Sequence, residues 1–442
     1  MCIFVAGKKL NIHKMQIVDR SQAPLIQDFT LFKPERPSVR VFSNGIPLVQ
    51  FLNPNLNLLH FIIKIKAGSL YEHKKQAAVF SYLLLKESSR HHSSSEVDEF
   101  LDYYGVQYTT SLSLEYAILN IVIPKPNCPT VLPFIFDFLL HPLFKEQNIE
   151  ILRKRKIMDL AYKQGKVSYC ASQLMLHHFF GSHNLVGKIL DEADLNSITS
   201  EDLYEHHRKS FCAENIRLFA AGNLDDEICN ILSELFETVP HGTSISLPSP
   251  LQNAKPQQQP LIDFHKDCLQ SSFFICKPSI GYQNAKRRNL EVLSTILGGY
   301  FGSRLMNNLR ETNGYTYGIS CDQLYYADTS IFYIESEVNV DVTRQAIDEC
   351  FKEIERLCQE PIASEELHLV QNYMAGQLLR KVDNTVSYMT QYSRWNDYGN
   401  DENEFERQMS SIMAFDAEQS RILAQEFMQK NDFTTIISGN IN

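Results

Sequence analysis

The stretch "LGGYFGSRLMNNLRETNGYTYG", residues 297–318, carries the most specific information in this chain. A glycine-rich segment comes first, and Arg310 and Tyr317 then bracket a second glycine turn. A guanidinium offers several fixed hydrogen-bond donors and a phenol adds another, so both can stabilise developing negative charge. Arg310 and Tyr317 are therefore candidate binding or catalytic residues. The alternative is that Arg310 pairs with a neighbouring acid such as Glu311 and that Tyr317 is a strand aromatic.

The composition describes a globular protein of more than one domain. The chain has 442 residues, of which 44% are hydrophobic and 21% charged, and its net charge is −10. This length exceeds one ordinary hydrophobic core. The acidic balance, with no long run of Lys or Arg, argues against a nucleic-acid partner. No apolar run is long enough to span a bilayer, so we expect no membrane partner.

The cysteines and the first residues bear on the cellular compartment. The ten cysteines are scattered without a CxxC pair, which is typical of small buried hydrophobes in a reducing compartment. The opening "MCIFVAGKKLNIHK" places its apolar patch before its lysines, the reverse of a secretory signal. Met15 begins a more ordinary start, so residues 1–14 read as an upstream extension. We expect a cytoplasmic protein.

One segment divides the chain into two parts of comparable length. Residues 239–260, "VPHGTSISLPSPLQNAKPQQQP", are rich in proline and glutamine and cannot build a core. Such a composition is typical of an extended connector. The sequence therefore predicts a first domain at 1–238, a linker at 239–260 and a second domain at 261–442.

The two parts repeat the same order of signals. A Gly-x-x-Tyr turn, at Gly105 and again at Gly314, leads into two alternating apolar segments that predict a hairpin. Helical patterns follow in each part, and each closes on a strand with a Gly-Asn pair, ending at Asn223 and Asn440. We predict an α+β fold of two similar domains in tandem, each a mostly antiparallel sheet packed against helices.

This order of elements closely resembles the pitrilysin-like (M16) family of zinc peptidases over nearly the whole chain. The stretches "NGIPLVQF", "IKAGSLYE", "GVQYTTSLSLEYAIL" and the final "SGN" fall in the family's order, and residues 297–318 are the most specific match. The resemblance implies an M16 metallopeptidase-like fold. It also implies that Arg310 and Tyr317 project into a cleft and hold the substrate backbone and the reacting carbonyl.

The motif that binds zinc in that family is missing. Family members carry HxxEH on a helix of the first domain, where two histidines at i and i+4 grip one ion and the glutamate activates water. Alignment on the helical pattern at 74–89 puts Val79, Tyr82 and Leu83 at these positions. Valine and leucine have no lone pairs for a metal, and tyrosine is a poor base at neutral pH. The pattern is apolar on nearly all sides, which predicts a buried helix.

Other residues do not replace the missing ligands. The further acidic ligand of the family falls on Leu160 or, with a one-residue slip, on Asp159. Adjacent histidines on a helix point about 100° apart and rarely chelate one ion. We therefore expect solvated or locally hydrogen-bonded histidines at the three pairs: His91-His92, His177-His178 and His206-His207. No catalytic zinc and no other cofactor is expected in this chain.

These observations predict a catalytically incomplete peptidase subunit. The resemblance implies that it lines a chamber for unfolded peptide, and that Arg310 and Tyr317 act in trans at the zinc site of a partner M16 subunit. Two alternatives stay open: a non-catalytic scaffold or peptide-binding pseudoenzyme, and a zinc metalloendopeptidase in its own right with unrecognised ligands. Whether the isolated chain forms a homodimer is also open.

Overall fold

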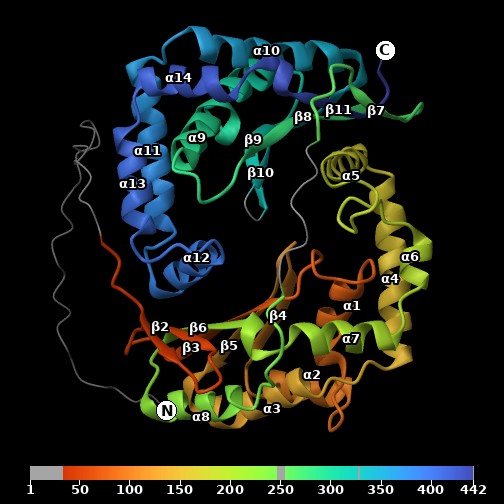
Figure 1. Ribbon diagram of the computed structural model, residues 1–442, viewed down its shortest axis with the longest axis vertical. Helices are drawn as coiled ribbons and strands as arrows, with labels where there is room; N and C mark the ends of the chain where they lie inside the picture. The colour runs from red at the N-terminus through yellow and green to blue at the C-terminus, as the bar shows by residue number, and fades with distance from the viewer. Residues whose placement is uncertain (1–32, 246–253, 327–328, 442) are drawn as a thin grey trace, which may run out of the picture. The chain divides into compact units, whose positions relative to one another are not determined.

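The computed structural model of the chain describes residues 33–245, 254–326 and 329–441 (Figure 1). The expected extension at 1–14 and the central part of the predicted linker, residues 246–253, lie outside the described residues. All elements below belong to one packed unit that begins at Pro34.

The first domain contains six strands and eight α-helices among its described residues. The strands are β1 (Ser38–Val41), β2 (Pro47–Leu52), β3 (Leu58–Lys66), β4 (Gln107–Leu112), β5 (Tyr116–Pro124) and β6 (Ile216–Gly222). The helices are α1 (Ala77–Leu83), α2 (Ser94–Tyr103), α3 (Cys128–Leu140), α4 (Glu146–Gln164), α5 (Val167–Phe180), α6 (Glu192–Asn196), α7 (Ser200–Ser210) and α8 (Asp226–Phe236).

The second domain contains five strands and six α-helices among its described residues. The strands are β7 (Leu261–Phe264), β8 (Gln270–Ile280), β9 (Ile319–Tyr326), β10 (Thr329–Asn339) and β11 (Thr434–Gly439). The helices are α9 (Arg287–Ser294), α10 (Thr343–Gln359), α11 (Ser364–Arg380), α12 (Thr385–Asp397), α13 (Glu404–Ala414) and α14 (Ala417–Phe427).

The two sheets have the same topology. The first runs β1-β2-β6-β3-β5-β4 and the second β7-β11-β8-β10-β9, so the order matches strand for strand once β1 is set aside. The β2–β6 and β7–β11 pairs are parallel and all other neighbours are antiparallel. The last strand of each domain ends on a glycine with nearly the same backbone angle, φ 133° at Gly222 and 139° at Gly439. The predicted fold of two similar, mostly antiparallel domains is confirmed.

Local signals explain where the elements begin. The β1–β2 hairpin turns at Asn44-Gly45, where Gly45 has φ 89° and Phe42 and Ile46 pair through their backbones at 3.0 Å. Helices α2 and α7 each begin at a capping box, in which the cap side chain and the third helical residue bond to each other's backbone N–H groups.

The domains exchange a helix. Helix α5 belongs to the first domain by sequence but packs on β8 and β11 of the second sheet, where Met175 and Phe179 join a core with Phe274 and Ile436. Figure 1 shows α5 beside these strands. In return, α12 of the second domain packs on β2 and β6 of the first sheet.

The α12 contact is aromatic and charged. Phe51 of β2 meets the rings of Tyr388 and Tyr392 edge-on, at centroid distances of 5.1 and 5.4 Å. Lys64 of β3, which is buried, donates to the Asp397 carboxylate at 2.6 Å. The sheet is therefore covered on both faces, which explains why β3 is buried without a break from Phe61 to Ile65.

The exchange bears on the predicted linker at 239–260. The segment lies between the two sheets in the sequence. However, α5 precedes the segment and packs on the second sheet, and α12 follows it and packs on the first. The boundaries of the domains thus stay a prediction from composition. Within the described part of the chain, no helix combines the length and the apolar character needed to cross a membrane.

Candidate functional site

Helix α1 contains Val79, Tyr82 and Leu83, the residues that the sequence alignment placed at the HxxEH positions. It spans only Ala77–Leu83, followed by a 3₁₀ turn at Leu85–Glu87, and is shorter than the pattern at 74–89 predicted. Val79 and Leu83 share one face at i and i+4, and this face is half-exposed. Leu83 lines a cavity of about 320 Å³. The prediction that this helix is buried on nearly all sides is wrong for this face.

Tyr82 points into the core instead. It is fully buried, and its hydroxyl donates to the Ser210 hydroxyl of α7 at 2.7 Å, because Ser210 itself donates to the His206 carbonyl at 2.6 Å. Burial raises the pKa of the Tyr82 phenol well above its ordinary value. The side chain is therefore a neutral structural group and cannot act as a base.

A zinc ion does not fit this set of residues. Val79 and Leu83 offer no donor atom, and the only hydroxyl of the three, that of Tyr82, is already bound inside the core. The expected distal ligand does not help, because Leu160 is buried and aliphatic and Asp159 is an exposed residue of α4. The positions of HxxEH are structural in this chain.

The neighbouring histidines are also structural. The His206 ring donates from Nε2 to the Ala67 carbonyl at 3.0 Å, and the His207 ring donates to the Leu139 carbonyl at 2.9 Å. Burial lowers the pKa of each imidazole to about 4, so both are neutral at pH 7. This agrees with the expectation of locally hydrogen-bonded histidines.

The second domain contains a different kind of site. Two π-helical segments, at Thr295–Gly299 and Met306–Thr312, flank the glycine-rich loop. Such segments are rare and are frequently found at functional sites. Gly298 packs directly on β9, since a Cβ atom there would lie 2.6 Å from the Cβ of Cys321. The glycine at position 298 is thus explained by the close approach of the first π-helical segment to the edge strand of the sheet.

Arg310 lies in the second π-helical segment with its side chain 36% exposed. Its guanidinium stacks over the Phe301 ring, 4.6 Å from the ring centre. Its Nε lies 3.5 Å from a Glu311 carboxylate oxygen, so the alternative pairing considered from sequence is present. An exposed ion pair of this length contributes little and leaves most guanidinium donors available.

Tyr317 is not a strand aromatic. It precedes β9, which begins at Ile319, and it is 92% exposed. The equivalent tyrosine of the first domain, Tyr108, lies inside β4 with its hydroxyl buried and its ring edge-on to Phe138 at 5.4 Å. The repeat therefore uses one tyrosine for packing and presents the other to solvent.

A cavity of about 600 Å³ connects these residues. Tyr317 and Phe301 both line it, so Arg310, stacked on Phe301, lies next to its wall. The charged side chains of the described lining are Glu335 and Glu337 of β10. Sequence analysis missed Phe301, Glu335 and Glu337. The signal for Phe301 was an aromatic residue inside the glycine-rich loop, whereas the glutamates carry no local signal because the hairpin alone brings them to the turn.

Two family profiles match the sequence. Residues 58–185 match "Insulinase (Peptidase family M16)" and residues 197–374 match "Peptidase M16 inactive domain". Curated relatives include an uncharacterized zinc protease of Streptomyces coelicolor, 20% identical over 79% of this chain and 78% of the relative. Another, from Bacillus subtilis, is 23% identical over 78% of this chain and 85% of the relative.

Solved structures share the fold. A peptidase M16 inactive domain from Pseudomonas fluorescens aligns with a TM-score of 0.83 and 16% identity, over 92% of this chain and 98% of the other. A protease from Helicobacter pylori aligns with a TM-score of 0.81 and 14% identity, over 92% of this chain and 100% of the other. At these identities the likeness concerns the fold alone.

Proposed function

Because the chain belongs to peptidase family M16 and has no metal ligand at the HxxEH positions, we propose that it is the non-zinc subunit of a two-chain peptidase. In this proposal it lines a chamber for unfolded peptide. It supplies Arg310 and Tyr317 to the zinc site of a partner M16 subunit.

The exposure of Tyr317 is the observation that carries the proposal. A tyrosine that is 92% exposed contributes almost nothing to the core of its own domain. It nevertheless sits on a glycine turn held by backbone and hydroxyl contacts, including the Thr316 hydroxyl, which donates to the Glu337 carbonyl at 2.7 Å. An ordered turn that presents a phenol to solvent is suited to bind a ligand or a partner.

The chemistry of the pair is hydrogen-bond donation. The Arg310 guanidinium and the Tyr317 hydroxyl can both donate to a peptide carbonyl oxygen and stabilise negative charge that develops on it. Phe301 restricts the guanidinium by stacking and so reduces the entropy that binding must remove. Neither residue can cleave a peptide bond by itself, which is why the proposal requires a second subunit.

The charge of the cavity predicts a substrate preference. Glu335 and Glu337 line it, and the rest of its described lining carries no charged side chain. A peptide that places a lysine or arginine in this cavity is therefore favoured over one that places an acid there. Binding of fluorescent unstructured peptides should be tighter for basic than for acidic sequences and should weaken with salt. The Glu335→Gln, Glu337→Gln double variant should remove this preference.

Reconstitution with the partner is the decisive test. Native pull-down identifies the bound M16 chain, and mixing the two purified chains should give peptidase activity that neither has alone. Arg310→Ala and Tyr317→Phe should each lower this activity at least tenfold, while both variants still bind the partner. Arg380→Ala and Tyr103→Phe, which change exposed residues on α11 and α2, serve as matched controls.

The scaffold alternative has one observation in its favour. The Glu311 contact and the stacking on Phe301 are interactions that a purely structural arginine would also make. In that case Arg310→Ala would assemble with the partner and leave the activity of the mixture unchanged. This result would contradict a role of Arg310 at the partner's zinc site. It would support the alternative in which this chain only forms a non-catalytic wall of the chamber.

A further inference from the structure

Three side chains with metal-binding atoms meet where α5 crosses the edge of the second sheet. They are Cys170 near the start of α5, Asp263 on β7 and His265 just after β7. The Cys170 thiol, an Asp263 carboxylate oxygen and a His265 ring nitrogen all lie within 4.8 Å of one another. In the described part of the chain, no other group of three such residues is gathered so closely.

The two residues from β7 are held by the sheet. Asp263 is the register partner of Ser438 on β11, and the Ser438 hydroxyl donates to the Asp263 carboxylate at 3.0 Å. The His265 backbone N–H donates to the Gly439 carbonyl at 3.1 Å, and its ring Nε2 lies 2.8 Å from the same Asp263 carboxylate. The Ser438 and Gly439 bonds hold the two residues as outer hydrogen bonds do in metal sites. The contact between the His265 ring and Asp263 joins two proposed ligands, and the ion would take its place.

Charge and burial also suit a cation. The side chains of His265 and Asp263 are 37% and 41% exposed, so an ion can reach them from solvent. Burial and the Asp263 carboxylate together raise the pKa of the Cys170 thiol. A cation placed between these groups reverses the second effect, because it stabilises both the thiolate and the carboxylate.

We propose that Cys170, Asp263 and His265 bind one zinc ion. A thiolate, an imidazole and a carboxylate are the three ligand types that zinc takes in proteins, and thiolate disfavours magnesium and calcium. When the ion binds, a zinc–sulfur bond forms and the Cys170 thiol releases its proton to solvent. The fourth position is left to water.

A zinc ion bound to these three residues would crosslink the two domains. Cys170 is contributed by the first domain, whereas Asp263 lies on the edge strand β7 of the second domain and His265 directly follows it. Zinc would join the exchanged helix α5 to β7 and stabilise the packing of the two domains. This ion is separate from the missing HxxEH site, and no peptidase activity is expected from it.

Zinc binding to the full chain tests the proposal. The protein is stripped with EDTA, dialysed and titrated with zinc chloride, and bound metal is measured by mass spectrometry. We expect one equivalent and a higher melting temperature with zinc. Cys170→Ser and His265→Gln should each weaken binding at least tenfold. Cys358→Ser, which removes another half-buried thiol, should bind like the parent.

Cobalt provides an independent readout. Cobalt(II) in place of zinc should give a thiolate-to-cobalt charge-transfer band in the near ultraviolet that is absent from Cys170→Ser. If Cys170→Ser fails to fold, Asp263→Asn and His265→Gln test the same site from the exposed side. The proposal is overturned if the parent binds no zinc, or if it binds zinc that these variants retain at the parental affinity.

Discussion

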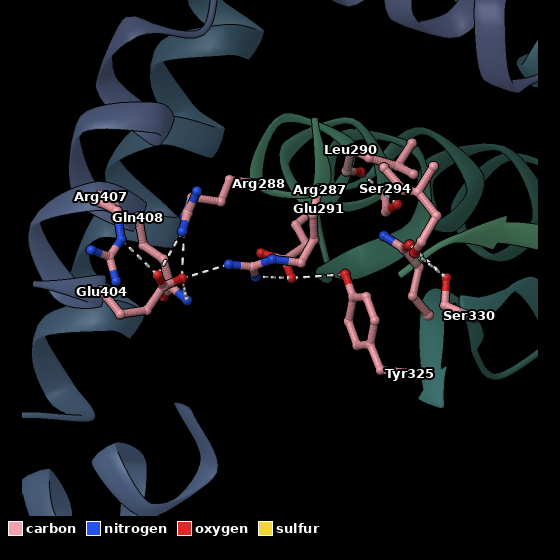
Figure 2. A network of polar contacts seen from close by, with 12 residues as sticks. Arg287, Arg288, Leu290, Glu291, Ser294, Tyr325, Ser330, Glu404, Arg407 and Gln408 are labelled. Carbon is pink, nitrogen blue, oxygen red and sulfur yellow. Dashed lines mark hydrogen bonds and ion pairs between the residues drawn. The ribbon is translucent and has the colours of Figure 1, made fainter. Parts of the chain in front are cut away.

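Helices α1 and α9 occupy equivalent places in the two domains, but their buried polar groups differ in charge. Beside Tyr82 on α1 these groups are neutral: its hydroxyl bonds to Ser210, and the imidazoles of α7 are uncharged. The ionisable groups buried near α1, Glu72 and Lys75, lie before its first residue. Around α9 they are ionic, since the guanidinium groups of Arg287 and Arg288 converge on the fully buried Glu404 of α13 (Figure 2). The three positions that align with HxxEH thus hold one neutral, buried tyrosine and two half-exposed aliphatic residues here. Around α9, the buried charges of Arg287 and Glu404 neutralise each other.

The largest expected effect comes from placing charge at α1. Val79→His, Tyr82→Glu and Leu83→His together recreate HxxEH, but they bury an unpaired carboxylate at Tyr82. We expect a loss of at least about 5 kcal/mol in the free energy of unfolding and no tight zinc binding. Most of the loss should come from Tyr82→Glu, because Val79 and Leu83 are half-exposed. Urea unfolding with and without zinc measures both quantities.

Tyr82→Phe is the control for that experiment. It removes one hydroxyl while Ser210 keeps its bond to the His206 carbonyl, so the cost should be only about 1 kcal/mol. A triple variant that binds zinc and is as stable as the parent would mean that α1 is not a neutral core.

The next largest effect should come from removing charge at α9. Glu404→Gln removes the fully buried carboxylate that Arg287 and Arg288 share, although Arg287 keeps its pair with Glu291. The change should cost about 3 kcal/mol, the lower end for a broken buried pair. Thermal or urea unfolding measures the loss. Glu418→Gln, which breaks an exposed pair with Arg421, should have a much smaller effect. If both substitutions had equal effects, the ionic character of the α9 region would not matter for stability.

The neutral histidines beside α1 should make stability depend on pH. Their folded pKa of about 4 lies below the unfolded value, so protons bind to the unfolded chain first as the pH falls below 6.5. Each should lower the free energy of unfolding by about 2 kcal/mol by pH 5, with the loss complete near pH 4. Glu72 acts in the opposite direction, because burial raises its pKa to about 7 and favours the folded chain at lower pH.

A variant isolates the histidine contribution. His207→Gln keeps an N–H donor for the Leu139 carbonyl but cannot bind the proton. Its free energy of unfolding should fall less steeply than that of the parent between pH 6.5 and 5. Parallel curves for the two proteins would show that His207 is not held neutral by the fold.

The smallest expected effect concerns the residue directly before each helix. Gln76 precedes α1 with φ 75°, whereas Lys286 precedes α9 with φ −79°. Left-handed backbone strains any residue except glycine, so Gln76→Gly should stabilise the protein by about 0.5–1 kcal/mol. Lys286→Gly should instead destabilise it slightly. A loss of melting temperature in Gln76→Gly would mean that the Gln76 side chain compensates for its backbone.

Local sequence signals predicted the fold well where they act over short distances. The Gly-x-x-Tyr turns, the Asn44-Gly45 hairpin and the closing Gly-Asn strands lie where expected because turn geometry is set by adjacent residues. The exchange of α5 and α12 could not be predicted, since periodicity identifies an apolar helix face but not the sheet that covers it. For the same reason α1 was expected to be buried on all sides, although Val79 and Leu83 are half-exposed.

The candidate sites also show that local sequence patterns do not predict which distant residues meet. Arg310 and Tyr317 lie seven residues apart and were proposed from their side-chain chemistry and the family resemblance, and their role stays a prediction. Glu335 reaches the cavity only through the pairing of β9 and β10, which no local pattern shows. Cys170 was only one of ten scattered cysteines in the sequence, and His265 carries no local signal. The two come from opposite sides of the linker and meet only through the helix exchange.

Because of the exchanged helix, the first domain cannot finish folding on the ribosome before the second domain has been synthesised. Helix α5 is synthesised long before β8 and β11, the strands that bury Phe179 and Met175. Until the last of these strands emerges, the nascent first domain exposes an apolar helix with nothing to cover it. Such a surface is a binding site for chaperones and a risk for aggregation. Translation of the second domain is therefore part of the folding of the first.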